Sequence, residues 1–232
     1  MSAEPRIKRH SEGPAGSPAW PLGLRVGFWI CIGIAMAAVI RRVFVLASPP
    51  QAGPPQLVAL DAEFAAHTAL TLTHILPALG FVATVPLVFV RRFARAMWPE
   101  WLLFPLGLVV SVTAYAMSVY SVGGWVERCA VLLFNTLFLF SLAYAFWYAR
   151  RGEPLLKLRW LTRAIGILLG IATTRPVMGV FFATSRLTHL EPSQFFGIAF
   201  WIGFSINTAV VEIWLRSPRG STFIDTWAAH AS

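Results

Sequence analysis

The sequence predicts an all-α membrane protein, a polytopic bundle of six transmembrane helices. Hydrophobic residues make up 57% of the 232-residue chain and charged residues only 12%, whereas about 25% of the residues of a soluble domain are charged. The mean hydropathy is +0.66, and the apolar residues are gathered into runs of about 20 residues, the length that crosses a hydrocarbon layer of about 30 Å. This composition excludes most water-soluble folds.

Six apolar runs follow one another along the chain, and each is long enough for one span. Short polar connections separate them, and the first connection, 48–55, contains four prolines, which end a helix. The predicted spans are 26–47, 64–90, 102–122, 126–149, 161–183 and 195–215. We therefore expect one transmembrane domain at 25–216, preceded by a flexible tail at 1–24 and followed by a C-terminal tail at 217–232.

Lys and Arg are concentrated on one side of the predicted membrane. The opposite connections carry only Arg186, and by the positive-inside rule the basic side faces the cytoplasm. Both termini are then cytoplasmic, which requires an even number of spans, and we expect the cytoplasmic (inner) membrane as the location. The fourteen residues on the basic side are Arg6, Lys8, Arg9, Arg25, Arg91, Arg92, Arg95, Arg150, Arg151, Lys157, Arg159, Arg163, Arg216 and Arg219.

Three polar residues on three different spans share one predicted depth. Counting about 1.5 Å per residue from the span ends places His74, Asn135 and Arg175 about 13–15 Å below the outer surface. Tyr115 lies a little higher, and His67 lies seven residues before His74 on the same helical face, near the outer interface. These five residues could therefore line one outward-opening pocket.

Arg175 is the most informative of these residues, because no carboxylate shares its predicted depth. A charge at depth in the membrane costs from about 3 to more than 10 kcal/mol, so it needs a partner or water. One interpretation is that Arg175 holds an anionic or carbonyl-bearing ligand. The other is structural: the guanidinium bridges the carbonyls of Thr73 and Ala172, whose helical donors Pro77 and Pro176 remove.

Ion pairs are expected on both sides of the membrane. Arg163 and Glu212 lie about three residues inside the ends of their spans, so they share a depth and can pair, although Glu212 could instead meet Arg216 four residues later. On the outer side the acidic residues lie near the surface, where they can pair with the arginines found there. The outer acids are Asp61, Glu63, Glu127 and Glu191, and the outer arginines are Arg41, Arg42, Arg128 and Arg186.

Cofactor and catalytic signatures are weak. Membrane cytochromes hold haem between histidines on facing helices, but His67 and His74 share one predicted helix and no other span contains a histidine. P-loop, zinc-protease, nucleophile-elbow and dinucleotide-binding patterns are also missing from the sequence. We therefore identify no catalytic residue and expect no cofactor or metal. The basic residues occur in short clusters between apolar runs, which favours the lipid bilayer rather than nucleic acid as partner.

Several of these residues belong to an ordered set of motifs between about Glu63 and Leu215. The motifs are Thr73-His74-Ile75 with Gly80, Gly123-Gly124, Arg159-Trp160-Leu-Thr-Arg163, Ile171-Ala-Thr-Thr-Arg175, and Trp201 through Asn207 to Glu212. The set resembles a family of bacterial predicted membrane proteins, domain of unknown function 2306. The resemblance implies a multi-helix membrane fold with His74, Arg163, Arg175, Asn207 and Glu212 as characteristic positions, and it implies no activity. Family members typically carry His-Arg pairs in both cytoplasmic connections, whereas this chain has no histidine at 96–101 and has Lys157 at the second position.

Three functions are compatible with these patterns. The first is binding or transport of a small anionic or polar molecule in the pocket around Arg175. The second is a redox, quinone-associated or haem-associated membrane subunit whose missing ligands come from a partner protein. The third is a structural or assembly role without a ligand, in which polar residues specify helix packing. The sequence shows no internal repeat of the kind common in transporters.

Overall fold

The computed structural model describes residues 21–48, 55–89 and 98–231, and within these ranges the chain forms helices and turns without strands. The helices are α1 (Leu22–Ala47), α2 (Pro55–Ala66), α3 (Thr68–Val88), α4 (Trp98–Met117), the short 3-10 helix η2 (Ser118–Tyr120), α5 (Gly124–Arg150), α6 (Pro154–Leu168), α7 (Gly170–Thr188), α8 (Pro192–Arg216) and α9 (Pro218–Ala231). Part of the predicted N-terminal tail and six of the predicted cytoplasmic basic residues lie outside the described residues: Arg6, Lys8, Arg9, Arg91, Arg92 and Arg95.

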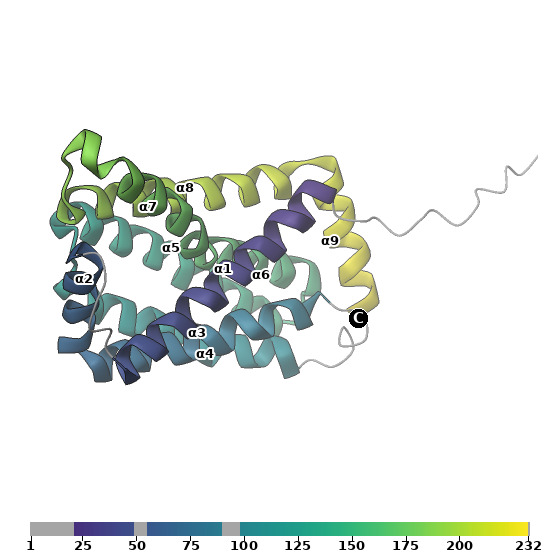
Figure 1. Ribbon diagram of the computed structural model, residues 1–232. Coiled ribbons are helices and arrows are strands. Elements are labelled where there is room, and N and C mark those ends of the chain that lie inside the picture. The colour runs from purple at the N-terminus through teal and green to yellow at the C-terminus, as the bar shows by residue number, and fades with distance from the viewer. Residues whose placement is uncertain (1–20, 49–54, 90–97, 232) are drawn as a thin grey trace, which may run out of the picture.

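Six helical segments in the described ranges are long and apolar enough to cross a membrane, which confirms the all-α class and the number of spans. They lie side by side as a bundle, and α1 crosses the face of the bundle obliquely (Figure 1). The described chain begins and ends at the same end of the bundle, as an even number of spans requires. The six segments are 22–47, 68–88, 98–120, 124–150, 154–185 and 193–216.

The fifth span consists of two helices, because α6 ends at Leu168 and α7 begins at Gly170. At this break the N–H of Ala172 donates to the carbonyl of Leu169, only three residues back, at 2.9 Å. A Cβ atom on Gly170 would lie 2.9 Å from Cα of Phe204 on α8. Only glycine therefore allows the start of α7 to approach α8 this closely.

The second predicted span, 64–90, overlaps two helices. The structure has α2 at one end of the bundle and begins the membrane-spanning α3 at Thr68, after a turn at His67 (Figure 1). His67 consequently lies at the end of α3 nearest α2, rather than inside the span. The apolar run extends across the turn, so hydropathy alone does not mark it.

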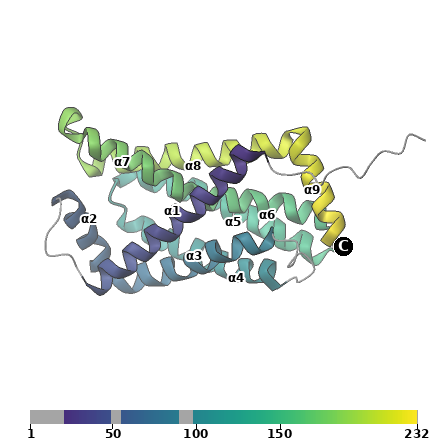
Figure 2. The ribbon, with the colours of Figure 1, turned by 45° about the vertical axis from the view of Figure 1, so that its right-hand side comes forward.

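The segment predicted as the C-terminal tail, 217–232, contains α9, which lies across the opposite end of the bundle from α2 (Figure 2). Its Ile224 and Trp227 are buried in an apolar cluster with Leu158 of α6 and Trp214 of α8. Phe223, Ile224, Trp227 and Ala228 recur at helical spacing and so form one apolar face. The face packs on the bundle, so α9 is part of the folded unit.

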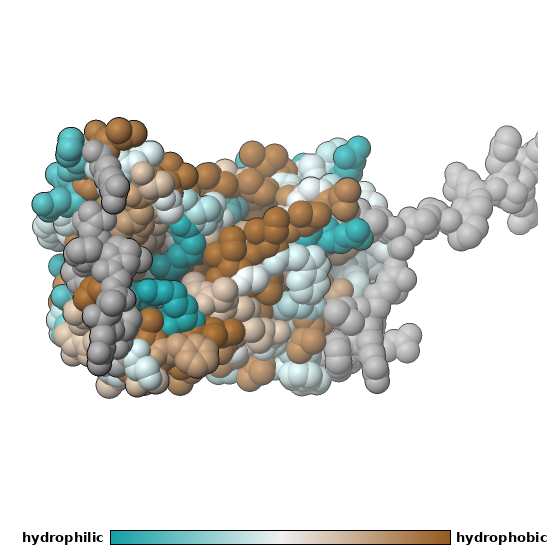
Figure 3. Space-filling view, viewed as in Figure 1, coloured by the Kyte–Doolittle hydropathy of each residue, from teal (hydrophilic) through white to brown (hydrophobic). Residues whose placement is uncertain are grey.

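Many large apolar side chains are exposed on the outside of the bundle, as expected for helices in contact with lipid. Figure 3 shows hydrophobic side chains along α1, and hydrophilic surface beside α1 at the end where α2 lies. Only three residues of α1 are buried, Ile32, Ala35 and Arg42. Its exposed large apolar residues are Leu22, Val26, Trp29, Ile30, Ile40 and Phe44.

Candidate functional site

A cavity of about 250 Å³ lies inside the bundle, between α1, α3, α4, α5, α6, α7 and α8, towards the end where α2 lies. Four of the residues predicted to share a pocket line it: His67, His74, Asn135 and Arg175. Tyr115 is not among the lining residues, and its hydroxyl is hydrogen-bonded to Oγ1 of Thr136 at 2.8 Å. The structure therefore brings four of the five predicted residues to one cavity.

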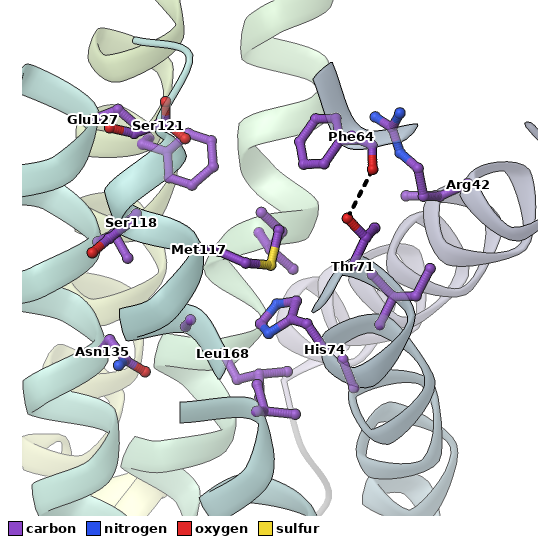
Figure 4. Close-up of a pocket in the computed structure, with 18 of the residues that line it drawn as sticks. Arg42, Phe64, Thr71, His74, Met117, Ser118, Ser121, Glu127, Asn135 and Leu168 are labelled. Carbon is purple, nitrogen blue, oxygen red and sulfur yellow. Dashed lines mark hydrogen bonds between the residues drawn. The ribbon is translucent and has the colours of Figure 1, made fainter. Parts of the chain in front are cut away.

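Polar groups occupy two levels of this cavity. Figure 4 shows Glu127 and Ser121 at one end, with His74, Asn135 and Leu168 towards the other. Eight residues of α5 separate Glu127 from Asn135, which corresponds to about 12 Å along the helix axis. We call the end with Ser121 and Glu127 the mouth, which is also lined by Arg42, Glu63 and His67, and the deeper level the polar ring, formed by His74, Asn135 and Arg175.

Arg175 carries a charge without a counterion. Its Nε atom is buried and has no hydrogen-bond partner, and the guanidinium forms no ion pair with any residue that the structure describes. The arginines Arg41 and Arg42 on α1 carry the same sign of charge and cannot compensate it. The alternative bridge to the carbonyls of Thr73 and Ala172 is not formed within the described residues.

The two arginines on α1 are paired, in contrast to Arg175. Asp61 on α2 accepts a hydrogen bond from Nη1 of Arg42 at 2.6 Å and another from Nη2 of Arg41 at 2.9 Å. The Arg42 guanidinium also lies 4.0 Å from the centre of the Phe64 ring, a cation–π contact. These contacts attach α2 to α1 beside the cavity and compensate the charge of Arg42.

His74 is held in one orientation by a neighbouring helix. Its Nδ1 lies 2.9 Å from Oγ1 of Thr113 on α4, and that hydroxyl is itself 2.6 Å from the carbonyl of Val109. The hydroxyl donates its single proton to the carbonyl, so Nδ1 of His74 carries the hydrogen and donates to Thr113. With the hydrogen on Nδ1, Nε2 is the acceptor nitrogen of the ring.

Asn135 and His67 are also positioned by their neighbours. Nδ2 of Asn135 donates to the carbonyl of Ser111 at 2.9 Å, which ties α5 to α4 and leaves the amide a second N–H and its oxygen. At the mouth, the His67 ring stacks on Tyr120 with ring centres 3.8 Å apart. The hydrogen bond of Asn135 and the stacking of His67 therefore hold both polar side chains in place in the cavity lining.

Glu127 also lines the cavity, although its position in the sequence predicted only an ion pair near the outer surface. Its carboxylate accepts a hydrogen bond from the N–H of Gly123 at 2.6 Å. A Cβ atom on Gly123 would come within 2.6 Å of the backbone nitrogen of Gly197 on α8, so the start of α5 touches the α8 backbone here. The sequence signal was the pair Gly123-Gly124 followed by a carboxylate three residues later.

Of the five residues that the resemblance marks as characteristic, three do not line the cavity. Arg163 donates to Glu212 through Nε at 2.8 Å and through Nη2 at 3.2 Å, which joins α6 to α8. Asn207 of α8 accepts a hydrogen bond from the hydroxyl of Thr173 at 2.7 Å and donates to the carbonyl of Gly166 at 3.5 Å. Asn207 therefore links α8 to both halves of the broken span.

A second ion pair at the α9 end was not predicted. Nζ of Lys157 on α6 lies 2.6 Å from Oε2 of Glu100 on α4, and the two side chains are only 8% and 13% exposed. The partners are 57 residues apart in sequence. Lys157 stands where the resemblance places a family histidine, and here it closes a buried ion pair between two spans.

Within the described residues, no three His, Cys, Asp or Glu side chains lie close enough together to hold a metal ion. Comparisons of the chain with protein-family models, with curated proteins and with solved structures gave no match. The geometry of the cavity is therefore the basis for a functional assignment.

Proposed function

We propose that the protein binds a small anionic molecule in the cavity around Arg175, His74 and Asn135. The observation that supports this is the buried guanidinium of Arg175, which lines a cavity and has no counterion among the described residues. Removing such a charge from water is expensive unless an opposite charge or hydrogen bonds replace the solvent. A bound anion supplies both.

The other groups of the polar ring fit an anion with a second polar function. Arg175 offers a planar set of N–H donors that matches a carboxylate or phosphate. Asn135 has one N–H left after its bond to Ser111, and Nε2 of His74 can accept a proton donor from the ligand. Most other lining residues are apolar, which is the usual composition of a small-molecule site.

We also propose that the mouth of the cavity faces the outer side of the cytoplasmic membrane, with both termini in the cytoplasm. In support, basic residues gather at the opposite end of the bundle, among them Arg25, Arg150 and Arg159. A relationship to the family domain of unknown function 2306 is likewise a proposal, supported by the ordered motifs, and it adds no activity.

The test compares small molecules that copurify with three forms of the protein. Wild type, Arg175→Leu and the control Arg150→Leu, in which an exposed arginine is removed, are purified in the same detergent, and the bound molecules are identified by native mass spectrometry. We expect an anion in wild type and in the control that is lost from Arg175→Leu. The same bound molecules in all three forms would contradict the proposal, as would haem or a quinone that remains after Arg175→Leu.

A further inference from the structure

The lining of the cavity is polar towards the mouth and apolar further inside. On α1, α3, α5 and the broken span α6–α7, one polar lining residue (Arg42, His74, Asn135 or Arg175) lies nearer the mouth, and the lining residues beyond it have hydrocarbon side chains. These apolar residues, which we call the floor, are Ala35, Ala38 and Val39 beyond Arg42, Ala78 and Val82 beyond His74, Phe138 beyond Asn135, and Ile167, Leu168 and Ile171 beyond Arg175.

The floor is deep and closed. His74 and Val82 are eight residues apart on α3, so the apolar lining continues for about 12 Å along the axis of α3 beyond His74. The residues at its far end are buried: Val82 and Phe138 are each 3% exposed and Ile167 is 5% exposed. A ligand that reaches this section exchanges water for hydrocarbon contacts, and any polar group placed there would lose its hydrogen bonds.

We infer that the ligand is an amphiphilic carboxylate, whose head binds Arg175 and whose unbranched hydrocarbon chain lies on the floor; this inference rests on the proposed function. The guanidinium can donate two parallel hydrogen bonds to a carboxylate, with Asn135 as a third donor. A sugar or a polyhydroxylated anion would place hydroxyls against the floor without partners. A hydrocarbon chain fits both the chemistry and the shape of the floor.

The floor also sets the length of the chain. An apolar lining of about 12 Å accommodates an extended chain of about nine bonds, because each bond of a zigzag chain advances it by about 1.3 Å. Each methylene that is buried adds about 0.8 kcal/mol, so affinity rises about fourfold per methylene until the floor is filled. A medium-chain acid therefore binds better than a short acid from solution, and the long-chain fatty acids of membrane lipids exceed the available depth.

The experiment measures carboxylate binding to the intact protein in phospholipid nanodiscs by isothermal titration calorimetry. The probes are acetate, butyrate, hexanoate, octanoate and palmitate, and the matching alcohols together with Arg175→Leu correct for partition into lipid. We expect affinity to increase about fourfold per methylene up to octanoate, with weaker binding of palmitate. An optimum at palmitate would indicate a lipid-derived ligand and would overturn the stated chain length.

A pair of variants on α3 locates the chain. Ala78 lines the floor, whereas Ala83 is exposed on the same helix, so Ala78→Phe fills the floor and Ala83→Phe adds the same side chain outside it. We expect Ala78→Phe to weaken octanoate at least tenfold while butyrate binding is retained, and Ala83→Phe to change neither. Equal octanoate binding in both variants would place the chain elsewhere and overturn the inference.

Failure of this inference is distinguishable from failure of the proposed function. Binding that depends on Arg175 but has equal affinity from acetate to octanoate would retain the anion site and reject the amphiphilic ligand. Carboxylate binding that is the same in wild type and Arg175→Leu would reject both. The chain-length series uses wild-type protein, so it decides the matter even if Ala78→Phe does not fold.

Discussion

Arg163 and Arg175 lie twelve residues apart on the same broken span, and their surroundings are opposite. Arg163 donates two hydrogen bonds to Glu212, whereas Arg175 has no acidic partner in the described part of the chain. The first lies in α6, towards the α9 end, where Lys157 is also paired. The second lines a cavity. A paired charge holds helices together, and an unpaired one beside a cavity is available to a ligand.

The same contrast extends to the whole bundle. At the α9 end, charge pairs join α4 to α6 and α6 to α8, and α9 adds an apolar cluster. At the α2 end, Asp61 compensates the arginines of α1, but the cavity separates the helices behind them. Substitutions at the α9 end should therefore change stability, and substitutions in the cavity should change binding.

The largest effect on stability is expected for Glu100→Gln. It leaves the ammonium of Lys157, only 8% exposed, without its carboxylate, and breaking a buried pair in this way costs about 3 kcal/mol. The measurement is the free energy of unfolding in mixed micelles, with the exposed Glu153→Gln as control. Equal stability of the two variants would show that the pair does not hold α4 and α6 together.

Arg175→Leu should separate binding from stability. Loss of charge-assisted hydrogen bonds worth about 1.5–3 kcal/mol weakens octanoate binding roughly 10-fold to 150-fold. The melting temperature of the ligand-free protein should not fall, because the change removes an uncompensated charge. A large loss of stability would instead assign Arg175 the structural role that Arg163 has.

Asn135→Asp would introduce a counterion into the polar ring. The new carboxylate lines the same cavity as Arg175 and repels an anionic ligand, so the affinity for octanoate should fall about tenfold, which corresponds to about 1.4 kcal/mol. Asn135→Ala removes the amide without adding charge and serves as the control. If both variants bind equally well, the charge at this position has no influence on the ligand.

Glu212→Gln should have a smaller effect than Glu100→Gln. Arg163 and Glu212 are 27% and 29% exposed, so water can partly replace the lost pair, and we expect a destabilisation of about 1 kcal/mol. Octanoate affinity should stay at the wild-type value, because neither residue lines the cavity. A change in affinity would show that the two ends of the bundle are coupled.

The smallest effect is expected for Arg216→Gln. Arg216 also donates to Glu212, at 2.9 Å, but its side chain is 77% exposed. A surface pair within one helix contributes about 0.3–0.5 kcal/mol. Thermal unfolding of Arg216→Gln and Glu212→Gln side by side therefore ranks the two arginines that share this carboxylate.

Much of the fold could be predicted from the sequence, because a span needs a long apolar run and such runs are visible directly. The positions at which a helix is interrupted were harder to predict. Hydropathy sums over a window, so it is the same whether Leu169 continues a helix or separates α6 from α7. α9 lies in the segment predicted as a C-terminal tail, although Phe223, Ile224 and Trp227 have the spacing of an apolar helix face.

The candidate site was predictable where depth alone decides contact. His74, Asn135 and Arg175 have equal predicted depths, and the structure places all three in one cavity. Depth does not specify the direction in which a side chain points around its helix. The prediction for Tyr115 was therefore wrong: its hydroxyl is hydrogen-bonded to Thr136, and it does not line the cavity. The pairing of Lys157 with Glu100 depends on which spans are neighbours, which one sequence does not specify.

Because the span is interrupted at Leu169, the rotation of α6 about its axis does not determine the rotation of α7. One residue inserted into α6 would turn its preceding part by about 100° and carry Arg163 away from Glu212. The setting of α7 is fixed independently by Gly170 against Phe204 and by Thr174 against Gly203. Changes in the half of this span towards the α9 end can therefore accumulate without turning the guanidinium of Arg175 towards the lipid.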